Sequence, residues 1–244
     1  MDDERRINLL KMMKDCNIEQ MKYNIEDKGT DEPNVYTCCY DKNKPELAKF
    51  CGPDWSLVSW PSAGIESFEE TTKQIVKEGN NEPLIDKVGW RGNIDTHFTR
   101  PLLKNIGDQN KDICDFDHIE GSKIKTDERA MTLPELVKTY KYLVDIGGIG
   151  FSGRLPYLLF SNRPLLLVDR DYVQYFYTDL EPYVHYVPVK QDLSDFIEKV
   201  KWLRNNEEKC KEIAVNAQKF ALERFTYENI LDKVKEVYKN FTSI

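Results

Sequence analysis

The chain is 244 residues long, and its 40% apolar and 32% charged residues are ordinary proportions for a soluble globular protein. Its formal net charge of −7 argues against a surface that binds nucleic acid or an anionic membrane. The first residues contain no long apolar run, so we expect no signal peptide, no membrane span and a cytoplasmic location. None of the six cysteines forms a CxxC pair, and we expect reduced thiols; the alternative is a bridge from Cys38 or Cys39 to Cys51.

The first half of the chain predicts alternating helices and strands. Apolar residues at helical spacing indicate an amphipathic amino-terminal helix. Ser67 and Glu70 have the spacing of a capping box, which marks the start of the second helix. The expected elements are helices over 4–22, 67–78 and 96–106, and strands over 35–40, 53–61, 84–90 and 111–116.

The second half continues the alternation and ends in helices. A charged connector, 120–132, leads into a helix whose first turn holds Pro134. Strands alternating with helices predict an α/β fold with helices on a parallel sheet, whose ligands bind beyond the carboxyl ends of the strands. The expected elements are strands over 142–146, 165–168 and 184–189, and helices from 133, from 152, and over 173–177, 193–205, 207–225 and 227–241.

The stretch 141–171 carries the clearest chemical pattern. Its first strand ends in three glycines, Gly147, Gly148 and Gly150, and a helix is expected to begin near Ser152. Glycines let the backbone approach a phosphate closely, and the first N–H groups of a helix face the anion. Arg154 adds a permanent cation with several donors. The pattern predicts a site for the phosphates of a sugar nucleotide.

The same glycines also fit a dinucleotide fingerprint. Gly148-x-Gly150-x-x-Gly153 matches it, and Asp169 lies about the right distance downstream. An NAD-dependent oxidoreductase is therefore an alternative. Two features argue against it: the segment between Gly153 and the next strand is short for a crossover helix, and only one further strand is expected.

Asp169 and Asp171 form an Asp-x-Asp pair at a strand end, which in one class of glycosyltransferase holds a divalent metal. We favour the simpler interpretation, in which Asp171 caps the following helix, and we expect no metal site and no cofactor. Trp60 is either an aromatic wall for a sugar or part of the core. We expect His185 to be structural.

Three blocks in this order resemble glycosyltransferase family 90, which includes capsule-associated proteins and the Rumi-type protein O-glucosyltransferases. WRGN at 90–93 is similar to the family's W/F-R-G-S segment. GFSGRL at 150–155 is the second block. FYTDLEPYVHYVPVKQDLS at 176–194 is similar to the signature FYxxLxPxxHYxPVKxDLS and is the most specific block. The resemblance covers about residues 50–240.

The resemblance implies a GT-B-like architecture of two Rossmann-like halves. We expect a reduced acceptor-side half at 1–125 and a UDP-sugar-binding half at 126–244. The resemblance also implies inverting, metal-independent transfer of a sugar, glucose or xylose, from a UDP-sugar to a hydroxyl of a glycan or protein. Trp60 would lie on the acceptor side. The residues expected to bind the UDP-sugar are Arg91, Ile149, Gly150, Phe151, Ser152, Gly153 and Arg154.

Inversion needs a carboxylate that takes the proton of the acceptor hydroxyl. In the family this base lies in a segment like N-x-R-D-x-P. The nearest match here, NIEDKG at 24–29, keeps the Asn and the Asp but lacks the Arg and the Pro. We therefore expect Asp27 to be the catalytic base, with Asp54 as the next candidate. A non-catalytic member that binds nucleotide or glycan is the remaining alternative.

Overall fold

A parallel five-stranded sheet forms the centre of the protein, for which a computed structural model describes residues 2–242. The strands lie side by side in the order β5-β4-β6-β7-β9, and every neighbouring pair is parallel. The α/β fold with a parallel sheet, predicted from the alternating elements, is confirmed. The strands are β4 Ile85–Gly92, β5 Cys114–His118, β6 Tyr140–Asp145, β7 Leu165–Val168 and β9 Val187–Val189.

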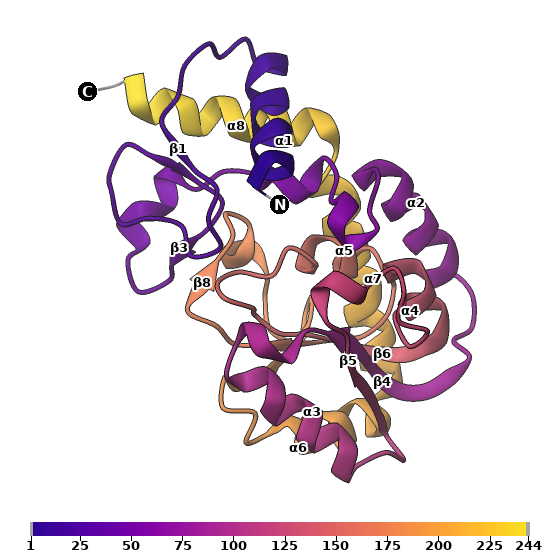
Figure 1. The fold of residues 1–244 in the computed structure, drawn as a ribbon. Helices are drawn as coiled ribbons and strands as arrows, with labels where there is room; N and C mark the ends of the chain where they lie inside the picture. The colour runs from indigo at the N-terminus through magenta and orange to yellow at the C-terminus, as the bar shows by residue number, and fades with distance from the viewer. Residues whose placement is uncertain (1, 243–244) are drawn as a thin grey trace.

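Both faces of this sheet are buried, because side chains alternate between two apolar clusters along each strand. On β6, Tyr142 and Val144 face the cluster under helices α3 and α6, whereas Leu143 faces the opposite cluster with α2, α4 and α5. Figure 1 shows α3 and α6 on one side of the sheet and α2, α4 and α5 above it. The helices are α1 Asp2–Asp15, α2 Phe68–Gly79, α3 Thr99–Gln109, α4 Leu133–Thr139, α5 Leu155–Leu159, α6 Phe196–Asn205, α7 Glu207–Arg224 and α8 Tyr227–Thr242.

The residues between α1 and α2 add no strand to the five-stranded sheet. They contain short 3₁₀ helices, η1 Pro45–Phe50, η2 Trp55–Leu57 and η3 Pro61–Ala63, and strands of two residues each. β1 Tyr23–Asn24 pairs with β2 Tyr36–Thr37, and β3 Tyr40–Asp41 pairs with β8 Tyr172–Val173 from the second half of the chain.

Two expected elements are wrong. The segment 53–61 is not a strand, because the Asp54 side chain accepts the N–H of Ser56 at 2.9 Å and caps η2 instead. The segment 173–177 is not a helix, because Val173 pairs with Tyr40 in an antiparallel bridge that ties the two halves of the chain together.

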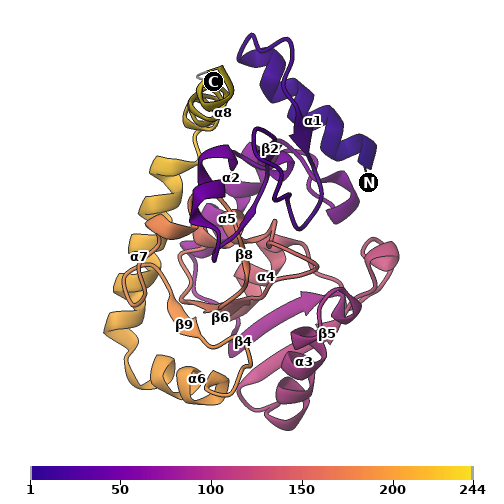
Figure 2. The same cartoon turned by 90° about the vertical axis from the view of Figure 1, so that its left-hand side faces the viewer.

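The last helices return to the amino terminus. Figure 2 shows α7 rising along the side of the sheet and α8 at the top of the molecule. There α8 contacts α1 and η1. The Tyr227 hydroxyl donates to Asp15 at 2.6 Å and accepts from Lys11 at 2.7 Å. The two ends of the chain therefore stabilise each other.

The five-stranded sheet takes β4 and β5 from before residue 125 and its other strands from after it. A boundary at 125 therefore does not separate two sheets, and the expected division into 1–125 and 126–244 stays a prediction. Among residues 2–242, no helix is long and apolar enough to cross a membrane.

Candidate functional site

The strand order places a crevice at the carboxyl ends of β4 and β6. From β4 the chain adds β5 on one side, and then returns to add β6 on the other side. In open α/β sheets such a change of direction leaves a gap between two loops, where ligands bind. Here the loops that follow β4 and β6 meet, and they carry the WRGN segment and the glycine turn.

Arg100 joins these two loops, and the sequence analysis missed it. Its Nη1 donates to the carbonyl of Asn93 at 2.9 Å, and its Nε to that of Gly147 at 2.8 Å. Its Nη2 donates to the carbonyl of Ile146 at 3.2 Å. The only signal in the sequence was its place in the first turn of the helix after β4, which does not reveal that the side chain crosses to β6.

Arg154 and Arg100 both lie over the Trp90 ring. The guanidinium carbons are 6.0 Å and 5.8 Å from the ring centroid, respectively. Nη1 of Arg154 donates to the carbonyl of Arg91 at 2.6 Å, but Nη2 is buried and has no hydrogen-bond partner among the described residues. Burial lowers the pKa of both arginines, and the charge of Arg154 lowers that of Arg100 further. A site with this excess of buried positive charge suits an anion.

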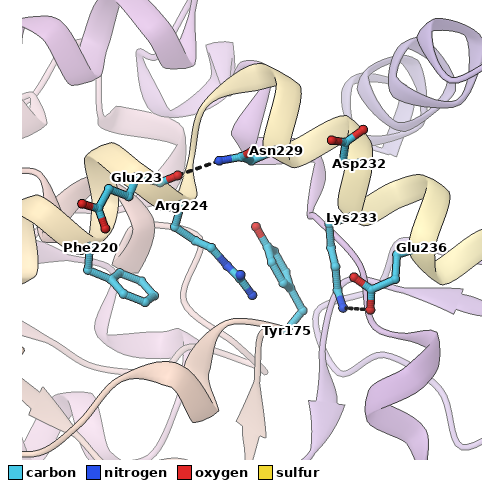
Figure 3. A pocket seen from close by; sticks show the side chains of 8 residues that line it. All are labelled: Tyr175, Phe220, Glu223, Arg224, Asn229, Asp232, Lys233 and Glu236. Carbon is cyan, nitrogen blue, oxygen red and sulfur yellow. Dashed lines mark hydrogen bonds and ion pairs between the residues drawn. The ribbon is translucent and has the colours of Figure 1, made fainter.

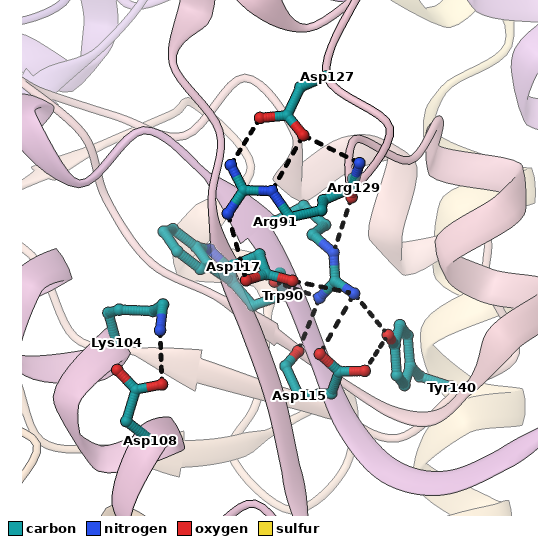
Figure 4. A network of polar contacts seen from close by, with 9 residues as sticks. All are labelled: Trp90, Arg91, Lys104, Asp108, Asp115, Asp117, Asp127, Arg129 and Tyr140. Carbon is teal, nitrogen blue, oxygen red and sulfur yellow. Dashed lines mark hydrogen bonds and ion pairs between the residues drawn. The ribbon is translucent and has the colours of Figure 1, made fainter.

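The guanidinium of Arg91, expected to hold diphosphate, instead makes ion pairs and hydrogen bonds with neighbouring protein groups. Arg91 follows Trp90 on β4 and therefore points to the opposite face of the sheet. Its Nη2 pairs with Asp115 at 3.2 Å and Asp117 at 3.6 Å and donates to Tyr140 at 2.8 Å (Figure 4). Its Nε donates to the carbonyl of Arg129 at 3.1 Å. Arg154 contacts Arg91 through the backbone carbonyl of Arg91, and the Arg91 guanidinium takes no part in this contact.

The glycine turn packs closely against the segment that holds Asp27. A Cβ on Gly150 would lie 1.5 Å from the carbonyl oxygen of Asp27, so only glycine fits there. The same oxygen accepts the N–H of Phe151 at 3.2 Å. The Phe151 ring is buried with Cys38, Cys39 and Trp55, so the turn joins the first segment of the chain to the sheet.

A buried polar group fixes the base of this turn. The Ser152 hydroxyl donates to Asp145 Oδ1 at 2.7 Å, and Arg170 Nη2 pairs with Asp145 Oδ2 at 2.7 Å. Nη1 of Arg170 is buried and lacks a partner among residues 2–242. With the buried Arg100 and the half-buried Arg154, the region therefore places three guanidinium groups near the buried carboxylate of Asp145.

The helix expected to begin near Ser152 is only five residues long, Leu155–Leu159. Pro156 in its first turn has no N–H to offer an anion, and Asn162 adopts a left-handed backbone conformation just beyond its end. A helix this short offers few free N–H groups to an anion, so most of the positive charge of the region belongs to the arginine side chains.

Two cavities lie at this end of the sheet. One, which we call the Trp60 cavity, has a volume of about 170 Å³ and is lined by Arg91, Arg100, Arg154 and mainly apolar side chains. The other, the glycine-turn cavity, has a volume of about 380 Å³ and is lined by residues 146–150, Arg170 and the exposed side chain of Ile149.

Trp60 is half-buried in the wall of the first cavity. Its ring packs edge-on against Trp55, with the centroids 5.2 Å apart. A Cβ on Gly153 would lie 3.0 Å from it, so Gly153 makes room for the indole. Trp60 thus lies in the same cavity as Arg154, where it could face a sugar bound beside a diphosphate.

The two candidate bases differ in accessibility. The Asp27 side chain is 30% exposed, and its Oδ1 pairs with Nη2 of Arg5 at 3.0 Å. Asp54 is fully buried and accepts hydrogen bonds from Ser56 and from Gln174, the latter at 2.6 Å. Burial raises the pKa of Asp54. Its contacts give it a structural role, which leaves Asp27 as the candidate that a hydroxyl can reach.

The acidic pair at the end of β7 binds protein groups. Asp169 accepts from Lys42 at 2.7 Å, and Asp171 accepts from Gln191 at 3.2 Å. Asp171 caps no helix, because none follows it. Within residues 2–242, no three His, Cys, Asp or Glu side chains are placed to hold a metal ion.

His185 has contacts typical of a structural residue. Its ring accepts the N–H of Glu181 at 3.0 Å and packs on Phe220.

A third cavity, of about 470 Å³, lies where α7 meets α8 (Figure 3). Arg224 and Lys233 lie on the ring of Tyr175, with 5.4 Å and 5.9 Å to its centroid. Both cations are paired, with Asp179 at 2.8 Å and Glu236 at 2.6 Å, respectively. Both cations of this cavity thus have a carboxylate partner, which Arg154 lacks among the described residues, although Nε of Arg224 is buried without a hydrogen-bond partner there.

Comparison with known proteins agrees with the resemblance seen in the motifs. The model of the family described as glycosyl transferase family 90 matches residues 6–244. The chain belongs to this family. Human protein O-glucosyltransferase 3 is 45% identical over 168 residues, which are 64% of this chain and 33% of the relative. Zebrafish (Danio rerio) protein O-glucosyltransferase 2 is 32% identical over 105 residues, 43% of this chain and 21% of the relative. This chain therefore covers a third or less of these two family 90 relatives.

Among solved structures, one of Anabaena HepE in complex with UDP and glucose is similar to this chain. The alignment covers 86% of this chain and 57% of the HepE chain. The two share 14% identity with a TM-score of 0.45. TarM aligns with 69% of this chain at 19% identity and a TM-score of 0.44. Similarity at this level carries no conclusion about the site.

Proposed function

We propose that this family 90 chain transfers a sugar from a UDP-sugar to an acceptor hydroxyl, with inversion and without a metal ion. The observation that carries the proposal is the buried guanidinium of Arg154, whose Nη2 has no partner among the described residues and which lies in the wall of a cavity beside Arg100. A diphosphate leaving group would supply the missing negative charge and acceptors.

In this mechanism Asp27 takes the proton of the acceptor hydroxyl. The hydroxyl oxygen then forms a bond to the anomeric carbon, and the bond from that carbon to the diphosphate breaks, with its electron pair leaving on UDP. Arg154 and Arg100 stabilise the negative charge that develops on the leaving group. Arg91 contributes by fixing the carbonyl to which Arg154 donates. Trp60 would face the acceptor.

The sugar and the acceptor follow from the relatives. Since proteins named O-glucosyltransferases are similar to this chain, we propose glucose as the first donor sugar to test, with xylose as the second. A hydroxyl on a protein or glycan is the proposed acceptor.

The test of the site is the affinity for UDP, measured by calorimetry. Arg154→Gln should weaken binding at least about tenfold, because a charge-assisted hydrogen bond is worth about 1.5–3 kcal/mol. Arg204→Gln is the matched control, since Arg204 is a surface arginine that pairs with Asp86. Equal UDP affinity in the wild type and Arg154→Gln would remove Arg154 from the site.

The test of the chemistry is the release of UDP from UDP-glucose and UDP-xylose, with water as acceptor. Wild-type release that is lost in Asp27→Asn supports transfer with Asp27 as the base. A wild type that binds UDP but releases none from any UDP-sugar would indicate the non-catalytic alternative.

A further inference from the structure

The carboxylate of Asp27 has one charged partner among the described residues, and that partner comes from a distant part of the chain. Arg5 lies on α1, with Nη2 at 3.0 Å from Asp27 Oδ1. The Arg5 side chain is 15% exposed, about half the exposure of the Asp27 side chain. The other residues of the proposed mechanism lie outside α1.

Arg5 is itself held in place by two further contacts. Its Nη1 donates to the carbonyl of Ile25 at 3.1 Å, two residues before Asp27. Its guanidinium lies on the face of the Trp55 ring, 4.9 Å from the centroid. A planar guanidinium that stacks on an aromatic ring and donates at a fixed angle has little freedom to reorient. Arg5 therefore presents Nη2 to Asp27 in one defined geometry.

The backbone around Asp27 is fixed separately. Its carbonyl accepts the N–H of Phe151 at 3.2 Å and the thiol of Cys39 at 3.2 Å. These contacts hold the main chain against the glycine turn, but they leave rotation of the carboxylate about its own side-chain bonds free. Among the contacts recorded for residues 2–242, the ion pair with Arg5 is the one that restrains this rotation.

We propose that Arg5 is a positioning residue, which orients the carboxylate of Asp27 so that one oxygen pairs with α1 and the other faces the acceptor hydroxyl. The inference rests on the proposed function, in which Asp27 is the base. A base works only when its oxygen lies within hydrogen-bond distance of the proton it removes. Fixing the carboxylate in advance raises the rate without adding any contact to the donor.

The experiment measures UDP release from UDP-glucose by the full chain, in wild type, Arg5→Gln and Arg5→Lys. Arg5→Gln should lower kcat about tenfold or more, because small misplacements of a catalytic group cost up to about a hundredfold. KM for UDP-glucose and the affinity for UDP should stay unchanged, since Arg5 lines neither the Trp60 cavity nor the glycine-turn cavity. Arg5→Lys should recover part of the rate. Arg6→Gln is the control, because Arg6 is the neighbouring exposed arginine of α1.

A double-mutant cycle separates positioning from a purely structural role. If Arg5 acts through Asp27, Arg5→Gln should cause no further loss of the residual rate measured for Asp27→Asn at high enzyme concentration. Independent, additive losses, or a parallel fall of kcat, UDP affinity and melting temperature, would overturn the inference. A wild-type kcat in Arg5→Gln, together with an inactive Asp27→Asn, would also overturn the inference. That result would leave the proposed function intact. A wild type that binds no UDP overturns the proposed function, and the inference with it.

Discussion

At the scale of single residues, the arginines near the end of β4 differ in what they contact. Arg100 and Arg154 lie over the Trp90 ring with the buried carboxylate of Asp145 nearby, whereas the Arg91 guanidinium pairs with Asp115 and Asp117. The alternation of side chains along β4 decides the difference. An arginine in a segment that resembles a family motif is therefore not by itself a ligand-binding residue, because the carboxylates around it determine its role.

Arg91→Lys tests this division. Lysine keeps the charge but has no planar fork, so it loses the simultaneous contacts to Arg129, Asp115 and Tyr140. We expect the free energy of unfolding to fall by about 1.5–3 kcal/mol, the range for hydrogen bonds to charged groups. Urea denaturation measures this. The UDP affinity of the folded Arg91→Lys variant should fall less than that of Arg154→Gln. A larger fall in Arg91→Lys would indicate that the Arg91 side chain binds the diphosphate.

At the scale of elements, the glycine turn and the Asp27 segment are packed directly against each other, and we call this contact the Gly150 joint. Gly150→Ala places a methyl group where the carbonyl oxygen of Asp27 lies, 1.5 Å from the ideal Cβ, so one of the two segments has to move. We expect a lower melting temperature and, since Asp27 is displaced, slower UDP release from UDP-glucose. Gly121→Ala is the matched control, because a Cβ there meets nothing within 4 Å. Equal effects of the two substitutions would contradict a joint at Gly150.

How far the sequence predicts the elements depends on where their interactions lie. Ser67 accepts the N–H of Glu70 and begins α2, and β7 spans 165–168, both as expected, since these signals are local. The segment 173–177 is different, because its partner Tyr40 is far away in the sequence. Arg100 was missed for the same reason: its carbonyl acceptors on the β6 loop are not neighbours in the chain. Periodicity describes one segment at a time and contains no information on such pairs.

At the scale of the whole molecule, the chain closes on itself so that its first helix reaches the site. The Tyr227 hydroxyl of α8 binds Lys11 and Asp15 of α1, and this helix also carries Arg5 to Asp27. In the proposed mechanism, the position of the base therefore depends on both ends of the chain, whereas the arginines proposed to bind the diphosphate lie beside the central sheet. Between α1 and α2 the strands are only two residues long.

The distribution of charge over the molecule predicts that activity does not need a metal ion. Arg100, Arg154 and Arg170 lie near a single buried carboxylate, so the leaving diphosphate meets positive charge that belongs to the protein. Asp169 is neutralised by Lys42, which leaves the Asp-x-Asp pair without two free carboxylates for a cation. UDP release from UDP-glucose should therefore be the same with and without EDTA, and Asp169→Asn should retain it. Loss of activity on chelation, restored by added Mg²⁺ or Mn²⁺, would show that the arginines do not suffice and that the acidic pair binds a metal after release from Lys42.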